Sequence, residues 1–166
     1  LLGTIDLSFP APWDHFTLSL ASRTTALDTV ELVFPVGSQF TQSVTGLAVT
    51  ASGLFSAALP ADTLYRVIVD DSGASPSVTS HGAVARGLRN AFGAAFAPSG
   101  DLLFVDNGFE DPSEPSQPLM TDELNRLGAA ELGGPVEDFG FPIQYVEYVT
   151  GNLIGAGGRL PEVAFQ

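Results

Sequence analysis

The chain has 166 residues, a formal net charge of −13 and no lysine, so its six cationic side chains are all arginine. This length, with a hydrophobic content of 45%, allows one folded domain with a core and argues against disorder. The negative charge argues against nucleic acid and anionic membranes as partners, and no apolar run approaches the ~20 residues of a membrane span. The absence of cysteine excludes disulfides, thiol catalysis and cysteine-bound metals.

The first half of the chain is a series of short apolar segments separated by turn residues. Period-two alternation predicts a half-buried strand over Thr4–Phe9 and another over His15–Leu20. The polar segment Ala21–Asp28 is interpreted as a hairpin connection. Further strands are predicted at Val30–Val36, Thr45–Thr50, Gly53–Leu59, Leu64–Val69 and Val78–Leu88.

The second half begins with a predicted hairpin and continues into a long acidic loop. A Pro-Ser-Gly-Asp turn, Pro98–Asp101, joins the apolar runs Phe92–Phe96 and Leu102–Val105, which we expect to pair antiparallel. The proline-punctuated loop Asp106–Glu123 follows, and only Thr121–Leu132 has a composition suited to a helix. Short strands spaced by about 8–12 residues predict an all-β fold, with sandwich, barrel and propeller all open.

Arg89 and Asn90 precede the first strand of that hairpin, and two interpretations of them stay open. One is a solvated arginine followed by an asparagine that caps a turn. The other is a ligand site, because the planar guanidinium binds carboxylates through two parallel hydrogen bonds. His15 is one of two histidines, and a lone histidine is typical of a hydrogen-bonded structural residue.

The acidic loop also has two interpretations, a solvated loop or a calcium site. Calcium binds about six to eight oxygens from carboxylates and carbonyls. The order Asp106-Asn107-Gly108 does not follow the spacing of an EF-hand, so that motif is absent. The carboxylates of the loop are Asp106, Glu110, Asp111, Glu114, Asp122 and Glu123.

Two segments resemble the soluble glucose/sorbosone dehydrogenases that use pyrroloquinoline quinone (PQQ). The stronger, Gly87–Pro142, is similar to that family's Gly-Leu/His-Arg-Asn-Pro-x-Gly, Asp/Glu-Asn/Gln-Gly, Asp-Glu-Leu/Ile-Asn and Gly-Trp-Pro series. The weaker joins Asp14-His15 to Leu32–Ser38, which is similar to the family's histidine-bearing strand and its Leu-Tyr-Val-x-Val-Gly-Ser/Asp strand end. Ala91 stands where the family commonly has proline, and Phe141 where it has tryptophan.

The resemblance implies two to three blades of a six-bladed β-propeller with its cofactor at the central axis. His15 would match the general base that takes the proton of a sugar hydroxyl while hydride passes to the quinone. The residues that would contact PQQ are Arg89, Asn90 and Asn107. The family's further cofactor contacts, arginines and a lysine, lie beyond the matched segments.

The resemblance also implies a calcium ion that polarises the cofactor. Its ligands here would be the carbonyls of Gly108 and Phe109, and the acidic loop adds Asp106 and Asp122 as carboxylate candidates. Ser38 stands where the family often has an aspartate beside its histidine, a change also found in the sorbosone branch.

We expect one propeller segment, with the first blades in residues 1–75 and the blade that carries the Arg-Asn and Asp-Asn-Gly motifs in 76–166. Both ends look truncated, so the open strand edges would pair with remaining blades or with identical subunits. The expected function is oxidation of a sugar or other small molecule. The alternative is a non-catalytic extracellular protein that binds or self-assembles through the same strands. The expected location is secreted, periplasmic or at the cell surface.

Overall fold

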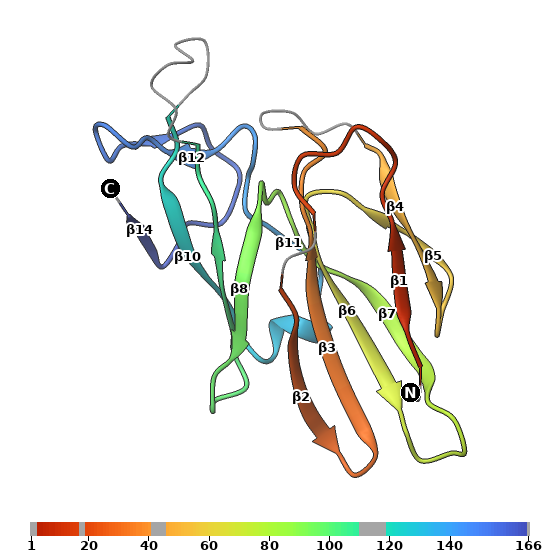
Figure 1. Ribbon diagram of the computed structural model, residues 1–166. Helices are drawn as coiled ribbons and strands as arrows, with labels where there is room; N and C mark the ends of the chain where they lie inside the picture. Colours follow the sequence, from red (N-terminus) through yellow and green to blue (C-terminus); the bar gives the residue numbers. More distant parts are fainter. Residues whose placement is uncertain (1–2, 17–18, 41–45, 110–118, 166) are drawn as a thin grey trace.

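The computed structural model describes residues 3–16, 19–40, 46–109 and 119–165, and this part of the chain is all-β (Figure 1). The all-β class is thereby confirmed. Helical structure within it is limited to one 3₁₀ turn, η1 (Glu131–Gly133), and no described helix is long and apolar enough to cross a membrane. The strands are β1 (Ile5–Ser8), β2 (Ala21–Ala26), β3 (Thr29–Val36), β4 (Ala48–Gly53), β5 (Ala57–Pro60), β6 (Thr63–Asp70), β7 (Ser77–Arg86), β8 (Ala91–Phe96), β9 (Leu102–Asp106), β10 (Asp122–Leu127), β11 (Glu137–Asp138), β12 (Tyr145–Val146), β13 (Leu153–Ile154) and β14 (Val163–Phe165).

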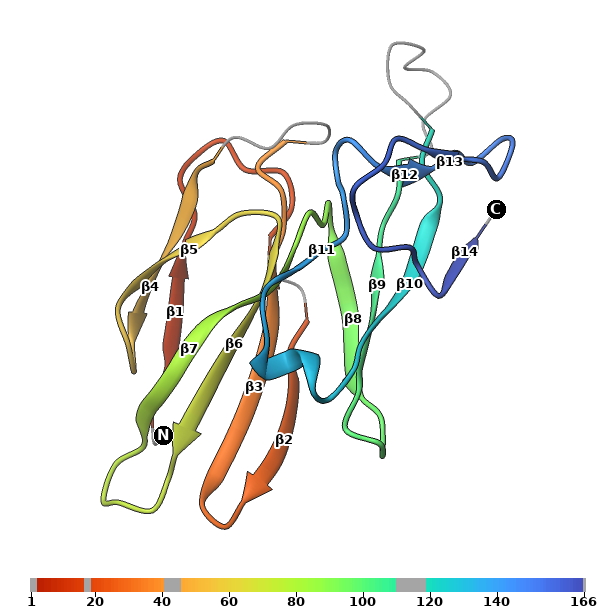
Figure 2. The same ribbon diagram turned by 180° about the vertical axis from the view of Figure 1, so that it is seen from behind.

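The five-stranded sheet lies in the middle, between the four-stranded and the three-stranded sheet (Figures 1 and 2). Its order is β11-β7-β6-β3-β2, and all pairs except β11–β7 are antiparallel. On one side stands the antiparallel sheet β14-β10-β9-β8, and on the other the sheet β1-β4-β5. β7 leads directly into β8, which packs beside β2 and β3. The first two sheets therefore meet along their edge strands.

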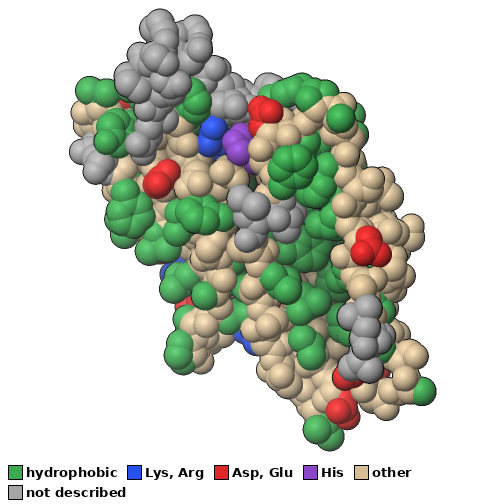
Figure 3. Space-filling view, viewed as in Figure 1, with side chains coloured by type: hydrophobic (Ala, Val, Ile, Leu, Met, Phe, Trp, Pro, Cys, Tyr) green, Lys and Arg blue, Asp and Glu red, His purple; other side chains and the backbone are tan. Residues whose placement is uncertain are grey.

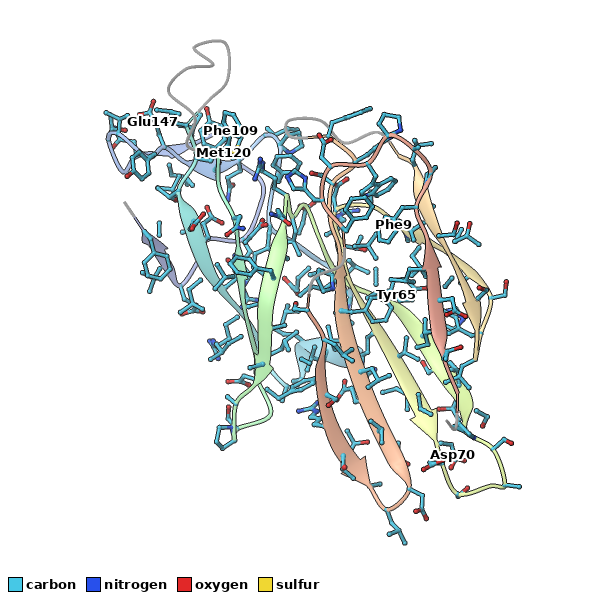
Figure 4. The ribbon with its side chains drawn as sticks, viewed as in Figure 1. Phe9, Tyr65, Asp70, Phe109, Met120 and Glu147 are labelled. Carbon is cyan, nitrogen blue, oxygen red and sulfur yellow. The ribbon has the colours of Figure 1, made fainter. Side chains whose placement is uncertain are left out.

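The central strands β3 and β6 of the middle sheet have apolar clusters on both faces, which explains why they are almost continuously apolar. Val33 and Leu64 face the sheet of β8–β10, where they pack with Phe104. The alternate residues Phe34 and Tyr65 face the sheet of β1, β4 and β5. Figure 4 shows Tyr65, together with Phe9 from the loop after β1, in this second layer. Fully buried members of the two clusters include Val36, Val49, Leu59, Val67, Leu102 and Leu127.

One acidic residue interrupts the apolar face of β3. Glu31 is 0% exposed and forms ion pairs with the Nε atoms of Arg23 on β2 and Arg66 on β6. Arg23 Nη1 also donates a hydrogen bond of 2.6 Å to the carbonyl of Gly100 in the β8–β9 turn. Its guanidinium lies 4.4 Å from the ring centroid of Phe96. The cluster therefore links the middle sheet to the sheet of β8–β10.

The predicted pairing of the two apolar runs around Pro98–Asp101 is confirmed. β8 and β9 pair antiparallel, with Phe96 opposite Leu102 next to the turn. Ala97 N–H donates to the Asp101 carbonyl (2.8 Å) and Gly100 N–H donates to the Ala97 carbonyl (2.9 Å), which closes the turn. The segments predicted as strands at Thr45–Thr50 and Gly53–Leu59 correspond to β4 (Ala48–Gly53) and β5 (Ala57–Pro60), which form an antiparallel hairpin.

Three local predictions are wrong. Ala21–Asp28 is not a connection, because Ala21–Ala26 forms strand β2. One of its polar side chains, Arg23, forms an ion pair with Glu31 on the neighbouring strand β3. Thr121–Leu132 is not a helix, because Asp122–Leu127 pairs with β9 and β14 as β10. The residues of His15–Leu20 that the structure describes lie outside any strand. β7 pairs with β6, so the middle sheet continues to Arg86.

Candidate functional site

The ends of β3 and β9 and the start of β8 meet at one end of the molecule and bring distant residues together. Ser38, just after β3, donates its N–H to the Arg89 carbonyl at 2.8 Å. His15 donates its N–H to the Ser38 carbonyl at 3.3 Å, so it lies on the other side of the same residue. Asn107 N–H donates to the Asn90 carbonyl at 3.2 Å. The residues predicted to contact the cofactor thus surround the start of β8.

The ring of His15 has a defined tautomer. Its Nδ1 lies 2.7 Å from Ser38 Oγ and 3.3 Å from the Ser38 carbonyl oxygen, which can only accept. Ser38 Oγ donates its single proton to the Phe40 carbonyl at 2.8 Å, so it accepts from the ring. Nδ1 therefore carries the proton and Nε2 carries a lone pair. Nε2 has no hydrogen-bond partner in the part of the chain that the structure describes.

Charge and burial keep this imidazole neutral. Burial lowers the pKa of His15 below its ordinary value, and the nearby positive charge of Arg89 lowers it further. The hydrogen bond to the Ser38 carbonyl and the charge of Asp14 oppose the shift without reversing it. On the face shown in Figure 3, a histidine lies at the surface next to a basic and an acidic side chain. A partly exposed imidazole with an unprotonated Nε2 is the arrangement that a general base needs.

Arg89 is committed to the chain's own backbone. It is 7% exposed, and its Nη1 donates to the carbonyls of Asn107 at 3.0 Å and Gly108 at 2.7 Å. The ring of Phe109 lies 5.5 Å from the guanidinium carbon. Burial lowers the pKa of Arg89, and the charges of Asp106 and other nearby carboxylates oppose that effect. The guanidinium therefore stabilises the start of the acidic loop.

Two carboxylates close the base of this loop. Asp106, the last residue of β9, accepts the N–H groups of Arg89 at 3.0 Å and Asn90 at 2.7 Å. Asp122, the first residue of β10, accepts the Gly108 N–H at 2.9 Å. A side chain at Gly108 would place its Cβ 2.1 Å from the Met120 carbonyl oxygen, so only glycine fits. Figure 4 shows Phe109 and Met120 side by side at this end, where Met120 N–H donates to the Phe109 carbonyl (2.7 Å).

Two buried acidic residues, Asp62 and Asp106, and the half-buried Glu123 lie near one another beside this site. Burial raises the pKa of Asp106 to about 6, although the two backbone N–H groups oppose the shift. Burial, reinforced by the charge of Asp106, raises the pKa values of Asp62 and Glu123 to about 7. Asp62 belongs to the β5–β6 turn and Glu123 to β10, so the cluster lies where the two sheets meet.

The predicted calcium ligands do not fit a resident calcium ion as they are arranged. The Gly108 carbonyl accepts from Arg89 and the Phe109 carbonyl from Met120 N–H, so an ion on Gly108 would face a guanidinium. Within the described ranges, no group of three or more His, Asp or Glu side chains is arranged to hold a metal. The predicted loop residues Glu110, Asp111 and Glu114 lie outside these ranges.

The cavity next to Arg89 is also too small for PQQ. Its volume is about 20 Å³, and its walls include Asp106, Asn107, Thr121 and Glu123. A space of this size holds about one water molecule. A tricyclic cofactor could reach Arg89 only from outside this cavity and in competition with two backbone carbonyls. We therefore derive no reaction step through PQQ or calcium.

The structure brings the predicted site residues that it describes to one end of the molecule, among them His15, Arg89, Asn107 and Asp122. Sequence reasoning missed two features there, the Phe40 carbonyl that fixes the Ser38 hydroxyl and the buried Asp62. Neither has a sequence signal, because each depends on contacts between segments that only the fold brings together.

The fold and the site define an all-β chain with a neutral histidine and a buried arginine where the strands of two sheets converge. Comparison of the chain with protein-family models, with curated proteins and with solved structures finds no match.

Proposed function

We propose that the chain is a segment of a β-propeller that resembles the PQQ sugar dehydrogenases. Two sets of strands support this, β2-β3-β6-β7 and β8-β9-β10-β14, each four antiparallel strands that lie side by side in chain order within one sheet. The hairpin β4–β5 interrupts the first set in the chain, and β11–β13 interrupt the second. The last strand of the first set leads directly into the first strand of the second. Successive propeller blades are connected in this way, from an outer strand to the inner strand of the next blade.

In this proposal His15 is the general base that accepts the proton of a substrate hydroxyl, with a sugar as the expected substrate class. The observation that carries it is the position of His15 Nδ1, 2.7 Å from Ser38 Oγ and 3.3 Å from the Ser38 carbonyl oxygen, which assigns the ring proton to Nδ1 and the lone pair to Nε2. Arg89 acts through charge by disfavouring the imidazolium. Oxidation also needs a hydride acceptor, which the resemblance implies would be PQQ, although the described residues beside Arg89 form no site of its size. A secreted, periplasmic or cell-surface location belongs to the same proposal.

The test is reconstitution of the purified chain with PQQ, calcium and a panel of aldoses, followed by reduction of an electron-accepting dye. Replacing His15 by alanine should lower turnover by about 10²–10⁴-fold, the usual contribution of a general base. His81→Ala is the matched control, because His81 bonds Tyr65 OH (3.0 Å) away from this site. No turnover by the unmodified chain, or equal turnover by both variants, would remove the catalytic proposal.

The second candidate is a non-catalytic protein that binds or assembles through its strand edges. β14 is an edge strand of its sheet among the described residues, and it exposes Val163 by 45% and Phe165 by 48%. An apolar, unpaired edge is a surface on which another strand can add. Remaining blades or an identical subunit are the expected partners.

Sedimentation velocity tests this candidate over a range of concentrations. Phe165→Lys should shift any oligomers toward monomer, because a charge would enter the strand-pairing surface. Leu27→Lys is the control, since Leu27 is 90% exposed in the β2–β3 turn and lies on no sheet edge. A monomer at all concentrations would contradict self-assembly.

A further inference from the structure

An apolar groove lies beside β1, between the sheet β1-β4-β5 and the middle sheet. Its volume is about 310 Å³, within the ~300–1,000 Å³ typical of binding sites. It shares no wall residue with the small cavity next to Arg89, so it is distinct from the site described above. The described part of its wall contains no charged side chain and consists mainly of Ile5, Leu7, Leu20, Leu32, Phe34 and Leu54. We call it the β1 groove.

The strand β1 is open along one side at this groove. It pairs with β4 on the other side, and no described strand pairs with its open side (Figure 1). Ile5 and Leu7 are half-buried and line the groove, whereas Asp6 and Ser8 alternate with them and are exposed. An unpaired edge offers backbone N–H and C=O groups to an added strand. Because alternate residues of a strand face the same side of a sheet, such a strand would place every second side chain in the groove.

The opposite wall of the β1 groove is strand β3 of the middle sheet. Leu32 and Phe34 are alternate residues of this strand, and both line the groove. Leu32 is only half-buried although β3 is an interior strand of its sheet, so the sheet β1-β4-β5 does not cover it completely. Alternate residues of an added strand lie about 6.8 Å apart, the same spacing as alternate residues of β3. Two neighbouring side chains can therefore enter the groove and bury apolar surface that is now partly exposed.

Charge favours a basic partner over a second copy of the chain. The chain has a net charge of −13 and no lysine. Asp6 lies exposed within β1, where a residue of an added strand would be its direct neighbour. Opposite charges at such cross-strand positions are favourable, and like charges are unfavourable. A segment with lysine or arginine at these positions would pair with Asp6 and would also be attracted by the charge of the whole chain.

We propose that the β1 groove binds an extended, basic segment of a partner protein by strand addition. The backbone of the segment pairs with the open side of β1. Its apolar residues, at alternate positions, pack between β1 and β3, and the lysine or arginine residues between them face Asp6 and solvent. This edge belongs to a different sheet from β14, so the proposal is independent of assembly through β14 and of a catalytic role for His15.

The experiment titrates the ¹⁵N-labelled chain, followed by NMR, with a capped peptide that alternates lysine and valine. One control peptide has the same composition with its lysines and valines in two blocks, and another has glutamate in place of lysine. We expect saturable shifts and slower amide exchange in β1 with the alternating peptide, at least about tenfold weaker binding of the block peptide, and no binding of the acidic one. Equal affinity for the two basic peptides, or shifts confined to other parts of the chain, would overturn the proposal. Shifts of the β1 amides when the chain alone is concentrated would assign the groove to a second copy and overturn it as well.

Two matched variants separate the groove from general electrostatics. Leu20→Lys should weaken the alternating peptide at least about fivefold, because it removes apolar wall and adds a charge of the same sign as the peptide. Leu27→Lys makes the same change in the β2–β3 turn, outside the groove, and should change the affinity less than about twofold. The two leucines are 60% and 90% exposed, so both variants should fold. Equal losses in the two variants would contradict binding in the β1 groove.

Discussion

Replacing Glu31 by glutamine removes the only negative charge of a buried cluster and leaves two arginines facing each other. Breaking a buried ion pair from one side generally costs about 3–5 kcal/mol, because the remaining charge is left unpaired. Here the side chains of Arg23 and Arg66 are 25% and 26% exposed, so water partly solvates them once the carboxylate is gone. We therefore expect a loss near the lower end, about 3 kcal/mol.

Urea unfolding followed by fluorescence measures this loss, since Trp13 is buried in the folded chain (7% exposed) and will report its exposure. For a chain of this size about 3 kcal/mol corresponds to a fall of about 6–12 °C in melting temperature. Glu137→Gln is the matched control, because its contact with Arg159 is 3.8 Å long and its side chain is 32% exposed. That control should lose no more than about 1 kcal/mol. Losses of equal size in the two variants would refute the role assigned to the buried cluster.

Three further outcomes are expected. Between about pH 4 and pH 7 Asp62, Asp106 and Glu123 hold more protons in the folded than in the unfolded chain, because their pKa values are raised, so these three groups make stability fall as pH rises. The lowered pKa of His15 opposes this fall in the upper part of the range. Calorimetry should show a shallower fall for Asp62→Asn. Gly108→Ala should lose about 1–3 kcal/mol through backbone overlap, as measured by urea unfolding. Millimolar calcium should leave the melting temperature unchanged, because the Gly108 carbonyl already accepts from the Arg89 guanidinium. A rise of several degrees, reversed by chelator, would show that this end of the molecule does bind calcium.

The all-β class and the hairpin around Pro98–Asp101 were predictable because local signals agreed with the final fold. Alternating apolar residues and turn formers favour a hairpin through local contacts, and the rest of the sheet does not change this preference. The strand β2 was not predictable in this way. Its polar sequence is typical of a connection, and it is a strand because it pairs with β3 and because Arg23 binds Glu31 and the Gly100 carbonyl, contacts that the local sequence does not reveal.

The burial of the charged residues Glu31 and Asp62 could not be predicted from the sequence either. Glu31 lies in an apolar strand, and Arg66, one of its partners, follows 35 residues later, so no local pattern connects them. Asp62 lies in a Pro-Ala-Asp turn, where an aspartate would ordinarily be solvated. Its burial results from the packing of the β5–β6 turn against the connection into β8, where Leu88 N–H donates to its carbonyl at 3.2 Å.

Arg89 lies among the other predicted site residues, but its observed contacts differ from those that the resemblance implies. The resemblance implies that its guanidinium binds carboxylates of a cofactor, yet Nη1 is bonded to the Asn107 and Gly108 carbonyls. A ligand carboxylate would have to displace these charge-assisted bonds and leave two carbonyls unpaired, which costs about as much as the new contact gains. The hydrogen bonds from Arg89 to the loop carbonyls are therefore more favourable for this charge than a bond to a ligand carboxylate. Arg89 fixes the start of the acidic loop and, at the same time, keeps His15 unprotonated. The site is therefore better suited to remove a proton from a neutral hydroxyl than to capture an anion.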